Sequence, residues 1–307
     1  MKTGVAIIIP VHNNLKFTQQ CISGLYGLLD PDNTRLNIDY QIVIVDDGSQ
    51  DGTEQWLRQN FPEITVLKGD GTLWWSGGIT KGARHAIQKM GTDYLLLWNN
   101  DIVPHKDYFN RLSQIIREKP RNMIIGSKIC DLTDPSKIWS MGGIFNPRKG
   151  HKYMLGLDVP VQINGNSPVE PDWLTGMGTL LPSEVIEKIG YWNAKDFPQY
   201  YGDADFTYRA KLAGFKLVIY PELTLYNDTS VTGFMHQDSF GKLLNSFVGI
   251  RSKYNIKKEI KFYRMYAESW RAYIPLFIRY FRYIGGFFKW KILRLLGVQR
   301  QQTSIGS

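Results

Sequence analysis

Acidic side chains follow two apolar stretches of the chain, where carboxylates could bind a nucleoside or a metal ion. Asp46 and Asp47 come directly after the apolar run QIVIV, within IVIVDDGSQDGT. A carboxylate there can accept a hydrogen bond from a base N–H or a ribose hydroxyl. Because Asp, Gly and Ser are also common turn residues, an ordinary turn is the alternative explanation.

Asp101 ends the second stretch, YLLLWNND. Mg²⁺ and Mn²⁺ prefer carboxylate oxygens, and the diphosphate of a bound nucleotide can supply further ligands. Such a metal neutralises charge that develops on a leaving phosphate. A turn at the end of a strand is again the alternative.

A third acidic group lies in GDADFTYRAKLAGF, where Asp203 and Asp205 precede a helical pattern. One of these carboxylates could act as a general base that takes a proton from an acceptor hydroxyl. Acidic residues at this place also cap helices and compensate the helix dipole, which leaves a purely structural role open.

A glycine-rich stretch, GGITKGARHAI, begins at Gly77. Backbone N–H groups and the basic side chains Lys81 and Arg84 suit a phosphate, although glycines that pack a helix closely would look the same. The stretch is neither a Walker A sequence nor a GxGxxG turn after the first strand. A P-loop ATPase and a dinucleotide dehydrogenase are therefore not supported.

The elements that must position these residues alternate between strand and helix. Apolar runs predict strands at 4–10, 41–46, 64–68, 94–98, 173–181 and 216–220, and helical spacing predicts helices at 14–29, 52–60, 79–90, 105–118, 183–189 and 205–214. Such alternation predicts a parallel sheet covered by helices on both faces. Ligands of these sheets bind outside the carboxyl ends of the strands, where the acidic residues lie.

Composition limits the remaining possibilities. The chain has 307 residues, of which 43% are hydrophobic and 21% charged, so a folded core is expected. Two cysteines exclude a disulfide framework and fit a reducing compartment. No uncharged apolar run reaches 18 residues, and the N-terminal apolar run is too short for a signal peptide. Neither a transmembrane helix nor a secretion signal is expected.

The net charge of +9 is concentrated near the C-terminus. Residues 240–300 contain 14 Lys and Arg but only 2 Asp and Glu, together with 15 of the 41 aromatic residues. In the stretch 273–296, cations recur among bulky apolar residues, which suits a helix lying on an anionic membrane surface. Packing against the catalytic domain or a dimer partner is the alternative, and the acidic nucleotide edge argues against nucleic acid as the main ligand.

The order of these motifs resembles that of family 2 glycosyltransferases with a GT-A fold. The resemblance covers about residues 4–230 and is strongest to the bacterial, rhamnosyltransferase-like branch that builds surface polysaccharides such as O-antigen or capsule. It rests on six motifs in the family's order: IIIPVHN, VDDGSQDGT, GGITKGARHAI, LLLWNND, WLTGMGTLLPSEVIEKIGYWN and GDADFTYRAKLAGF. It implies an α/β fold with a Rossmann-like, mostly parallel sheet flanked by helices, to which the basic, aromatic, helical C-terminal region is appended.

The resemblance also implies roles for individual positions. Asp101 would hold the metal, and Asp203 would be the catalytic base. The positions implied for the nucleotide are Pro10, Val11, Asp46, Asp47, Gly78, Arg84, Asn99 and Asn100. The positions implied for the sugar and acceptor are Trp74, Trp173, Thr175, Gly176 and Asp205.

The sequence departs from the family pattern at three places. The first position of the DxD-like motif is Asn99, and the Glu of the ED motif is Gly202. A His often found after the last core strand is replaced by Asn227. His236 is a candidate substitute ligand, with an ordinary surface histidine as the alternative.

These observations predict a GT-A catalytic domain at 1–239, with a nucleotide-binding half at 1–118 and an acceptor-binding half at 119–239. Residues 240–307 would associate with a membrane or pack on protein. The implied reaction is inverting transfer of a hexose or deoxyhexose from a UDP- or dTDP-linked donor to a hydroxyl of a lipid-linked glycan. It would use Mn²⁺ or Mg²⁺ on the cytoplasmic face of the membrane, and a homodimer is left open. The alternatives are a catalytically degenerate glycan- or membrane-binding module and a sugar nucleotidyltransferase.

Overall fold

The computed structural model describes residues 2–29, 37–157, 167–228 and 239–296, so the predicted ligand His236 lies outside the described residues. The chain divides into two compact units. The first comprises Met1–Gly143 and Met154–Ser230, and the second comprises Ile144–Tyr153 and Val231–Ser307. A short segment from the middle of the sequence thus groups with the C-terminal region.

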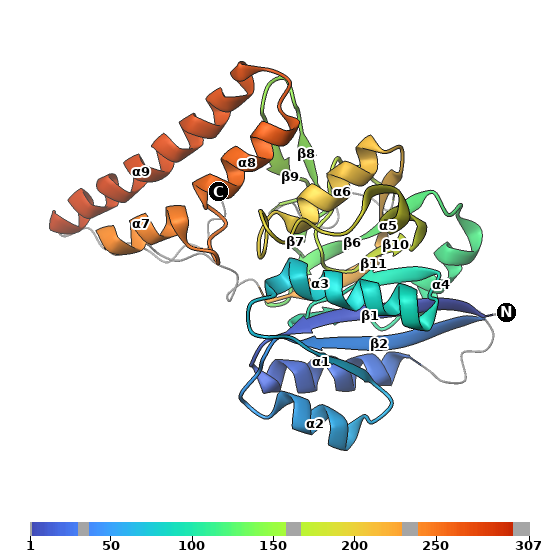
Figure 1. The fold of residues 1–307 in the computed structure, drawn as a ribbon. Coiled ribbons are helices and arrows are strands. Elements are labelled where there is room, and N and C mark those ends of the chain that lie inside the picture. The colour runs from blue at the N-terminus through green and yellow to red at the C-terminus, as the bar shows by residue number, and fades with distance from the viewer. Residues whose placement is uncertain (1, 30–36, 158–166, 229–238, 297–307) are drawn as a thin grey trace. The chain divides into compact units, whose positions relative to one another are not determined.

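The described part of the first unit is built on a mixed, mostly parallel sheet (Figure 1). Its strands are β1 (Thr3–Val11), β2 (Ile38–Asp46), β3 (Thr65–Lys68), β4 (Tyr94–Leu97), β5 (Ile102–Pro104), β6 (Met123–Asp131), β7 (Ile138–Ser140), β10 (Thr179–Pro182) and β11 (Lys216–Asn227). They follow the order β3-β2-β1-β4-β10-β6-β11-β5, and β7 pairs with β6. β10 runs antiparallel to β4 and β6, and β5 runs antiparallel to β11.

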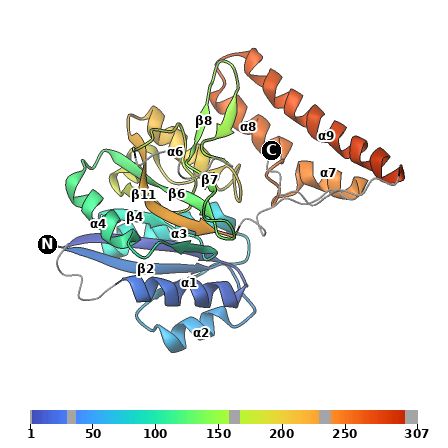
Figure 2. The ribbon, with the colours of Figure 1, turned by 180° about the vertical axis from the view of Figure 1, so that it is seen from behind.

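Helices cover both faces of this sheet. They are α1 (Leu15–Leu28), α2 (Thr53–Asn60), α3 (Trp74–His85) with the π-helical segment η2 (Ala86–Met90), α4 (Tyr108–Glu118), α5 (Glu184–Ile189) and α6 (Gly202–Leu212). Alternate residues of β1 point to opposite faces: Ile7 packs in the core that includes α1 and α4, and Ile8 in the core that includes α3 and α6. Figures 1 and 2 show α1 and α2 on one side of the sheet and α3 on the other. The predicted α/β class is confirmed.

Two helices begin earlier than the sequence pattern predicts. α3 starts at Trp74 rather than near residue 79, and α6 starts at Gly202 rather than 205. The glycines inside α3 are explained by close packing: an added Cβ at Gly78 would lie 2.9 Å from Pro10 Cβ, and one at Gly82 would lie 2.4 Å from Ile8 Cγ2. These glycines let the helix approach the sheet and do not end it.

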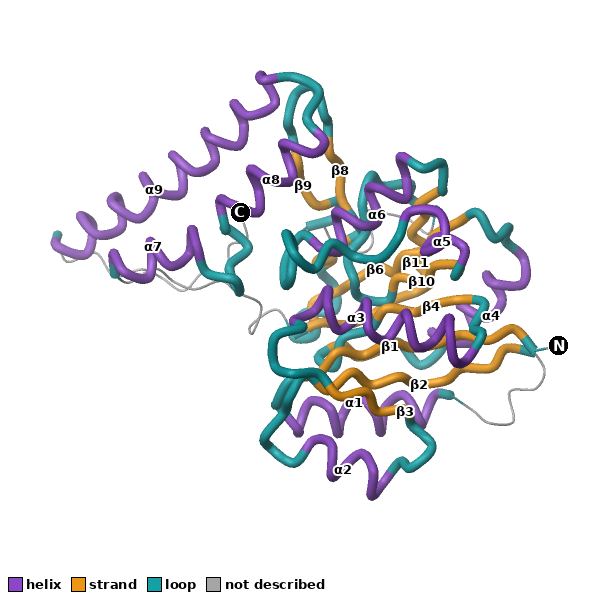
Figure 3. The backbone as a smooth tube through the Cα atoms, viewed as in Figure 1, coloured by secondary structure: helices purple, strands orange, loops and turns teal. Residues whose placement is uncertain are grey.

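The second unit consists of a β-hairpin and helices. The hairpin strands are β8 (Gly143–Phe145) and β9 (Lys152–Met154), and the helices are α7 (Phe240–Val248), α8 (Ile256–Tyr266), the short 3₁₀ segment η4 (Trp270–Ala272) and α9 (Tyr273–Leu295). Figure 3 shows the hairpin beside α8. Phe145 packs edge-on against Phe262 and Tyr263, and the Tyr263 hydroxyl donates to Gly150 O at 2.6 Å. The helical C-terminal region predicted from composition is therefore present.

Candidate functional site

The loops after β1 and β2 are tied to each other at the carboxyl edge of the sheet. The carboxylate of Asp46 accepts the backbone N–H of Ser49 at 2.9 Å. Asn13 joins the loops twice: its N–H donates to Ser49 Oγ at 2.7 Å, and its Oδ1 accepts the N–H of Gln50 at 2.9 Å. Both loops are therefore held in one arrangement before any ligand binds.

Asp47 uses both of its carboxylate oxygens on backbone groups. Oδ1 accepts the N–H of Gly71 at 2.8 Å, and Oδ2 accepts the N–H of Trp74 at 3.0 Å. Gly69 lies so close that an added Cβ would be 2.4 Å from Asp47 Oδ1. In this structure Asp47 therefore fixes the loop before α3 and the first residue of that helix.

A chain of contacts joins the DxD-like motif to α6. The indole N–H of Trp75 donates to Asn99 Oδ1 at 3.0 Å. The ring of Trp75 lies over Gly176, where an added Cβ would come within 2.1 Å of Cζ2. The N–H of Gly176 in turn donates to Asp203 Oδ2 at 3.0 Å. Four segments that are distant in the sequence thus converge on one place.

The position of Asp203 is determined by two further contacts. Its Oδ1 accepts the N–H of Ala204 at 2.8 Å. Thr207 donates to the backbone oxygen of Asp203 at 2.8 Å and accepts the N–H of Leu174 at 3.0 Å, which ties α6 to the 173–178 loop. The Asp203 carboxylate is half-buried, and backbone donors orient it.

Close packing around Gly202 leaves no room for a Glu at this position. An added Cβ would lie 2.0 Å from Ser76 Oγ and 3.0 Å from Phe197 O. Ser76 Oγ donates to Phe197 O at 2.6 Å, so α3 and the loop before α6 meet at this glycine. A larger side chain does not fit between them.

Two bulky residues at this edge adopt the left-handed backbone conformation. Trp74, the first residue of α3, has φ of 55°, and Tyr201, which precedes α6, has φ of 72°. Positive φ costs a residue with a Cβ on the order of 1–2 kcal/mol. Such strain persists where the surrounding contacts determine it, and it is common at functional sites.

Asp101 lies in an environment that suits a cation. Its Oδ1 is buried and has no hydrogen-bond partner among the described residues. Burial raises the pKa of this carboxyl, and the charge of Asp228 adds to the effect, whereas hydrogen bonding from the Asn99 side chain lowers it. A buried carboxylate oxygen without a partner is unfavourable unless it meets a proton or a metal. The residue therefore fits the predicted metal ligand.

The described side chains around Asp101 do not form a complete metal site by themselves. Within the described ranges, no three side chains of His, Cys, Asp or Glu gather as a metal-binding group. Asn227 is fully buried at the end of β11, opposite Ile102. Neither of its side-chain amide atoms has a hydrogen-bond partner among the described residues.

Several predicted positions surround this centre in structural roles. Pro10 and Val11 end β1, and Gly78 packs on Pro10. Asn100 donates to Thr18 Oγ1 of α1 at 3.1 Å. In the 173–178 loop, the ring of Trp173 fills the space over Gly143, and Thr175 O accepts the Thr179 hydroxyl at 2.6 Å.

Two predicted positions are not brought to this centre. Arg84 lies in the last turn of α3, about 15 Å along the helix from Trp74, and its guanidinium stacks 5.0 Å from the Tyr191 ring centroid. Asp205 is fully buried and forms an ion pair with Arg209 at 3.1 Å. Ser76 and Thr207 join segments of the candidate site, but the sequence pattern does not indicate them. Their contacts are with residues that are far apart along the chain.

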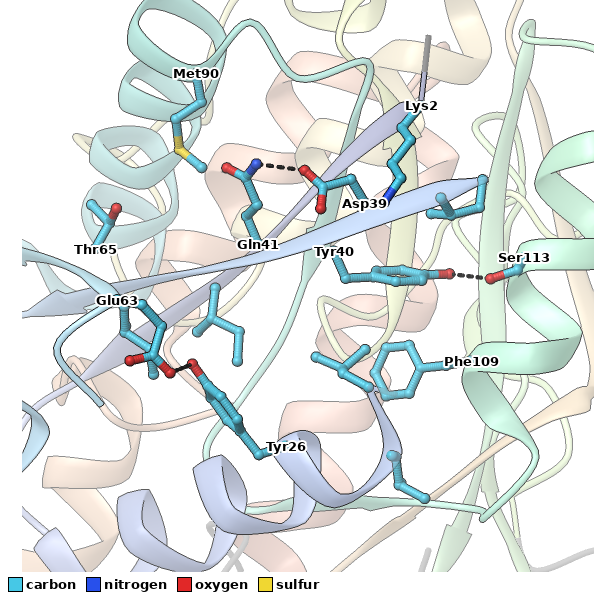
Figure 4. Close-up of a pocket in the computed structure, with 15 residues that line it drawn as sticks. Lys2, Tyr26, Asp39, Tyr40, Gln41, Glu63, Thr65, Met90, Phe109 and Ser113 are labelled. Atoms are coloured by element: carbon cyan, nitrogen blue, oxygen red, sulfur yellow. Dashed lines mark hydrogen bonds between the residues drawn. The ribbon is translucent and has the colours of Figure 1, made fainter. Parts of the chain in front are cut away.

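A cavity of about 510 Å³ lies at the opposite, amino-terminal edge of the sheet (Figure 4). Its wall includes Lys2 before β1, Asp39 and Gln41 in β2, and Thr65 in β3. Gln41 donates to Asp39 at 2.6 Å. Because ligands of parallel sheets bind at the carboxyl edge, this cavity is separate from the candidate site.

Comparison with known proteins gives a family match. The model of Glycosyl transferase family 2 matches residues 6–174. The low-salt glycan biosynthesis hexosyltransferase Agl10 of Haloferax volcanii is 24% identical over 180 residues, which are 56% of this chain and 53% of that protein. The chain therefore spans about half the length of this curated relative.

Two solved structures share the fold at low sequence identity. Mannosyltransferase PcManGT from Pyrobaculum calidifontis, in complex with GDP-Man and Mn²⁺, gives a TM-score of 0.57 at 14% identity over 90% of this chain and 68% of its own. GalNAc-T7 with UDP, GalNAc and Mn²⁺ gives 0.55 at 12% identity over 74% and 44%. These similarities confirm a GT-A-like fold.

Proposed function

The chain belongs to glycosyl transferase family 2, and on this basis we propose that it transfers one sugar from a nucleotide-diphosphate donor to a hydroxyl group of a glycan. The observation that supports this proposal most directly is the connected set Asn99, Trp75, Gly176 and Asp203. It joins the DxD-like motif to the proposed base at the sheet edge where ligands bind.

In the proposed reaction, Asp203 takes the proton from the acceptor hydroxyl. The N–H groups of Gly176 and Ala204 donate to this carboxylate and orient it. The deprotonated oxygen attacks the anomeric carbon from the face opposite the leaving diphosphate. A single displacement of this kind inverts the configuration, which is the outcome we propose.

The nucleotide would lie against the loops after β1 and β2. We propose that Asp46, at the end of β2, contacts the nucleoside, because the hydrogen bonds between Asn13, Ser49 and Gln50 hold this surface in place. Asp47 would act indirectly by fixing the start of α3.

Asp101 is the residue proposed to hold a divalent metal, Mn²⁺ or Mg²⁺. When bound, the metal would neutralise charge on the donor's diphosphate. The buried, unpartnered Oδ1 supports this role. Oxygen atoms of the diphosphate would complete the coordination, as is common for these cations.

The finer assignments also remain proposals. We propose a UDP- or dTDP-linked hexose or deoxyhexose as donor and a lipid-linked glycan of a surface polysaccharide as acceptor. We also propose that the chain belongs to the rhamnosyltransferase-like bacterial branch, that it lies on the inner face of the membrane and that it forms a homodimer. The basic, aromatic C-terminal region supports the membrane position.

Thermal unfolding with nucleotides tests the donor site. UDP, dTDP and GDP are added with and without Mn²⁺, because a ligand that binds only the native state stabilises it by about 2.7 kcal/mol at 100 times its Kd. We expect one diphosphate to raise the Tm in a Mn²⁺-dependent manner. The Asp101→Asn variant should lose this shift. The control variant is Asp107→Asn, which changes an exposed carboxylate directly before α4 and should keep the shift.

Two results would contradict the proposal. The donor site is wrong if no nucleotide changes the Tm. The Asp101 assignment is wrong if the shift persists in excess chelator or in the Asp101→Asn variant.

A further inference from the structure

One side of α9 carries large apolar side chains that other described residues leave uncovered. The exposed fraction of Phe281 is 73%, and that of Leu295 is 83%. Apart from the adjacent pair Phe277 and Ile278 and the turn that contains Gly285, successive members are three or four residues apart, so they form one stripe along the helix. We call this the α9 stripe: Ile274, Phe277, Ile278, Phe281, Phe288, Ile292 and Leu295.

The opposite side of α9 is packed within the second unit, which fixes the rotation of the helix. Leu276, Tyr280 and Phe287 are buried. The Tyr280 hydroxyl donates to Tyr254 O at 2.9 Å. Arg279 forms an ion pair with Glu259 of α8, which is almost fully buried. Because these contacts use the inner side, the α9 stripe cannot turn inward without breaking them.

Exposed cations border the α9 stripe on both sides. With 100° between successive residues, Arg282 and Lys289 fall along one border and Lys291 falls along the other. None of the three forms an ion pair with another described residue. Their charge is therefore available to an anionic ligand that spans the width of the helix.

Helix α7 of the second unit also presents apolar side chains outward. Phe240, Leu244 and Val248 are exposed at four-residue intervals along one side of it. The other side of α7 contacts α9 through Phe247, whose ring centroid lies 5.7 Å from that of Tyr280. Helix α9 is thus not alone in presenting apolar side chains outward.

Helix α9 is suited to lie along a bilayer rather than to cross it. None of the helices in the described ranges combines the length and apolarity needed to span a membrane. Five cations interrupt the 23 residues of α9. A helix with one apolar side, bordered by Lys and Arg, lies with that side in the interface between head groups and acyl chains.

We infer that the α9 stripe docks on the surface of an anionic lipid bilayer, with Arg282, Lys289 and Lys291 on lipid phosphates. Charge decides between this occupant and a second copy of the chain. A two-fold interface between stripes would place like cations against each other within a region of strong positive charge. Anionic head groups neutralise the same cations.

This inference sharpens the membrane position given under the proposed function. It does not rest on sugar transfer, because vesicle binding is measured without nucleotide. Failure of the stripe to bind lipid would leave the nucleotide result intact, and failure of the nucleotide test would leave vesicle binding intact.

Cosedimentation of the full chain with vesicles tests the inference. One preparation is pure phosphatidylcholine, and the other contains 30 mol% phosphatidylglycerol as the source of negative charge. We expect binding to the anionic vesicles to be at least tenfold stronger, since a negatively charged surface attracts basic residues that lie near it. Added salt should weaken it.

Matched variants locate the contact. The double variant Phe281→Ser/Ile292→Ser should lose most binding, and Leu212→Ser, which changes an exposed leucine of α6, should bind normally. Arg282→Glu/Lys289→Glu should lower anionic-vesicle binding at least tenfold, and Lys16→Glu on α1 should not. All six positions are exposed, so folding should be retained.

Three results would overturn the inference. These are absence of vesicle binding by the native chain, equal loss in the control variants, and a dimer in light scattering that the Phe281→Ser/Ile292→Ser variant disperses while lipid has no effect. The last result would assign the α9 stripe to a second copy.

Discussion

Helices α3 and α9 both contain glycine pairs, but the two units use them in opposite ways. In α3, Gly78 and Gly82 lie where the helix presses on β1, and no Cβ fits. In α9, an added Cβ at Gly285 or Gly286 would meet no described atom within 4 Å. The same residue type marks close packing in α3 and open surface in α9.

The charged groups of the candidate site and those of α9 differ in a similar way: the former are hydrogen-bonded and the latter are exposed. Acidic side chains of the first unit, such as Asp47 and Asp203, accept hydrogen bonds from backbone groups of distant segments. Cations of α9, such as Arg282 and Lys289, extend into open space. The candidate site in the first unit is thus held by hydrogen bonds to the backbone, whereas the α9 stripe and the cations beside it form an exposed surface.

The largest expected effect is on the rate of sugar transfer, and it tests whether Asp203 is the catalytic base. Asp203→Asn should lower turnover about 10³-fold, because general-base catalysis contributes about 10² to 10⁴ in rate. The measurement is sugar transfer to a water-soluble acceptor, which makes the rate independent of lipid. The nucleotide-induced Tm shift should remain.

A matched change in the second unit, Phe281→Ser, should leave this turnover unchanged. Equal rates for native chain and Asp203→Asn would show that the base assignment is wrong. Equal losses in both variants would remove the functional distinction between the units.

The next effect concerns the ion pair that orients α9. Glu259→Gln should lower the free energy of unfolding by about 2–4 kcal/mol, since it leaves the partly buried Arg279 without a counter-charge. The matched change is Glu54→Gln in α2, whose exposed partners are Arg58 and Lys68. It should cost less than about 1 kcal/mol. Urea denaturation of both variants measures the difference, and equal values would contradict the claim that the α8–α9 contact is a buried anchor.

The glycine comparison gives a prediction of opposite sign in the two units. Gly82→Ala should destabilise the chain by about 1–3 kcal/mol, because the new methyl group meets Ile8. Gly285→Ala should stabilise it by about 0.5–1 kcal/mol through helix propensity alone. Chemical denaturation decides, and changes of the same sign would show that the two helices are packed alike.

The last prediction concerns a dependence of stability on pH that arises in the second unit. Burial lowers the pKa of Lys258 in α8 to about 8 from its usual 10.5. Between these values the folded state binds fewer protons than the unfolded state, so stability should rise with pH. From this group we expect a gain of about 1 kcal/mol between pH 7 and pH 9. Lys258→Met should reduce the rise over this range without abolishing it, because burial also lowers the pKa of Lys253 to about 8. An unchanged profile would exclude Lys258 as a source.

Much of the fold was predictable because it follows from local patterns. Short β-branched runs gave the strands β1, β2 and β4, and helical spacing gave α1 and α4 close to their observed bounds. The antiparallel insertion of β10 and the early start of α3 were not predictable. They depend on which strand lies beside β4 and on the hydrogen bond by which Asp47 holds the N–H of Trp74.

The candidate site was likewise predictable only in part. Asp101 and Asp203 could be named from motifs in the family's order. Arg84 was expected beside the nucleotide, but only the course of α3 shows that it lies at the far end of the helix. Asp205 was expected at the acceptor, and only its burial against Arg209 shows how it is used.

The sequence by itself determined the class of fold, the acidic residues at the strand ends and the concentration of cations and aromatic residues near the C-terminus, because these follow from residue type and periodicity. The tertiary structure decided that Trp75 and Gly176 link Asn99 to Asp203, that Ser76 excludes a side chain at 202, and that the apolar stripe of α9 is exposed. Each of these depends on contacts between segments far apart along the chain, which no local pattern specifies.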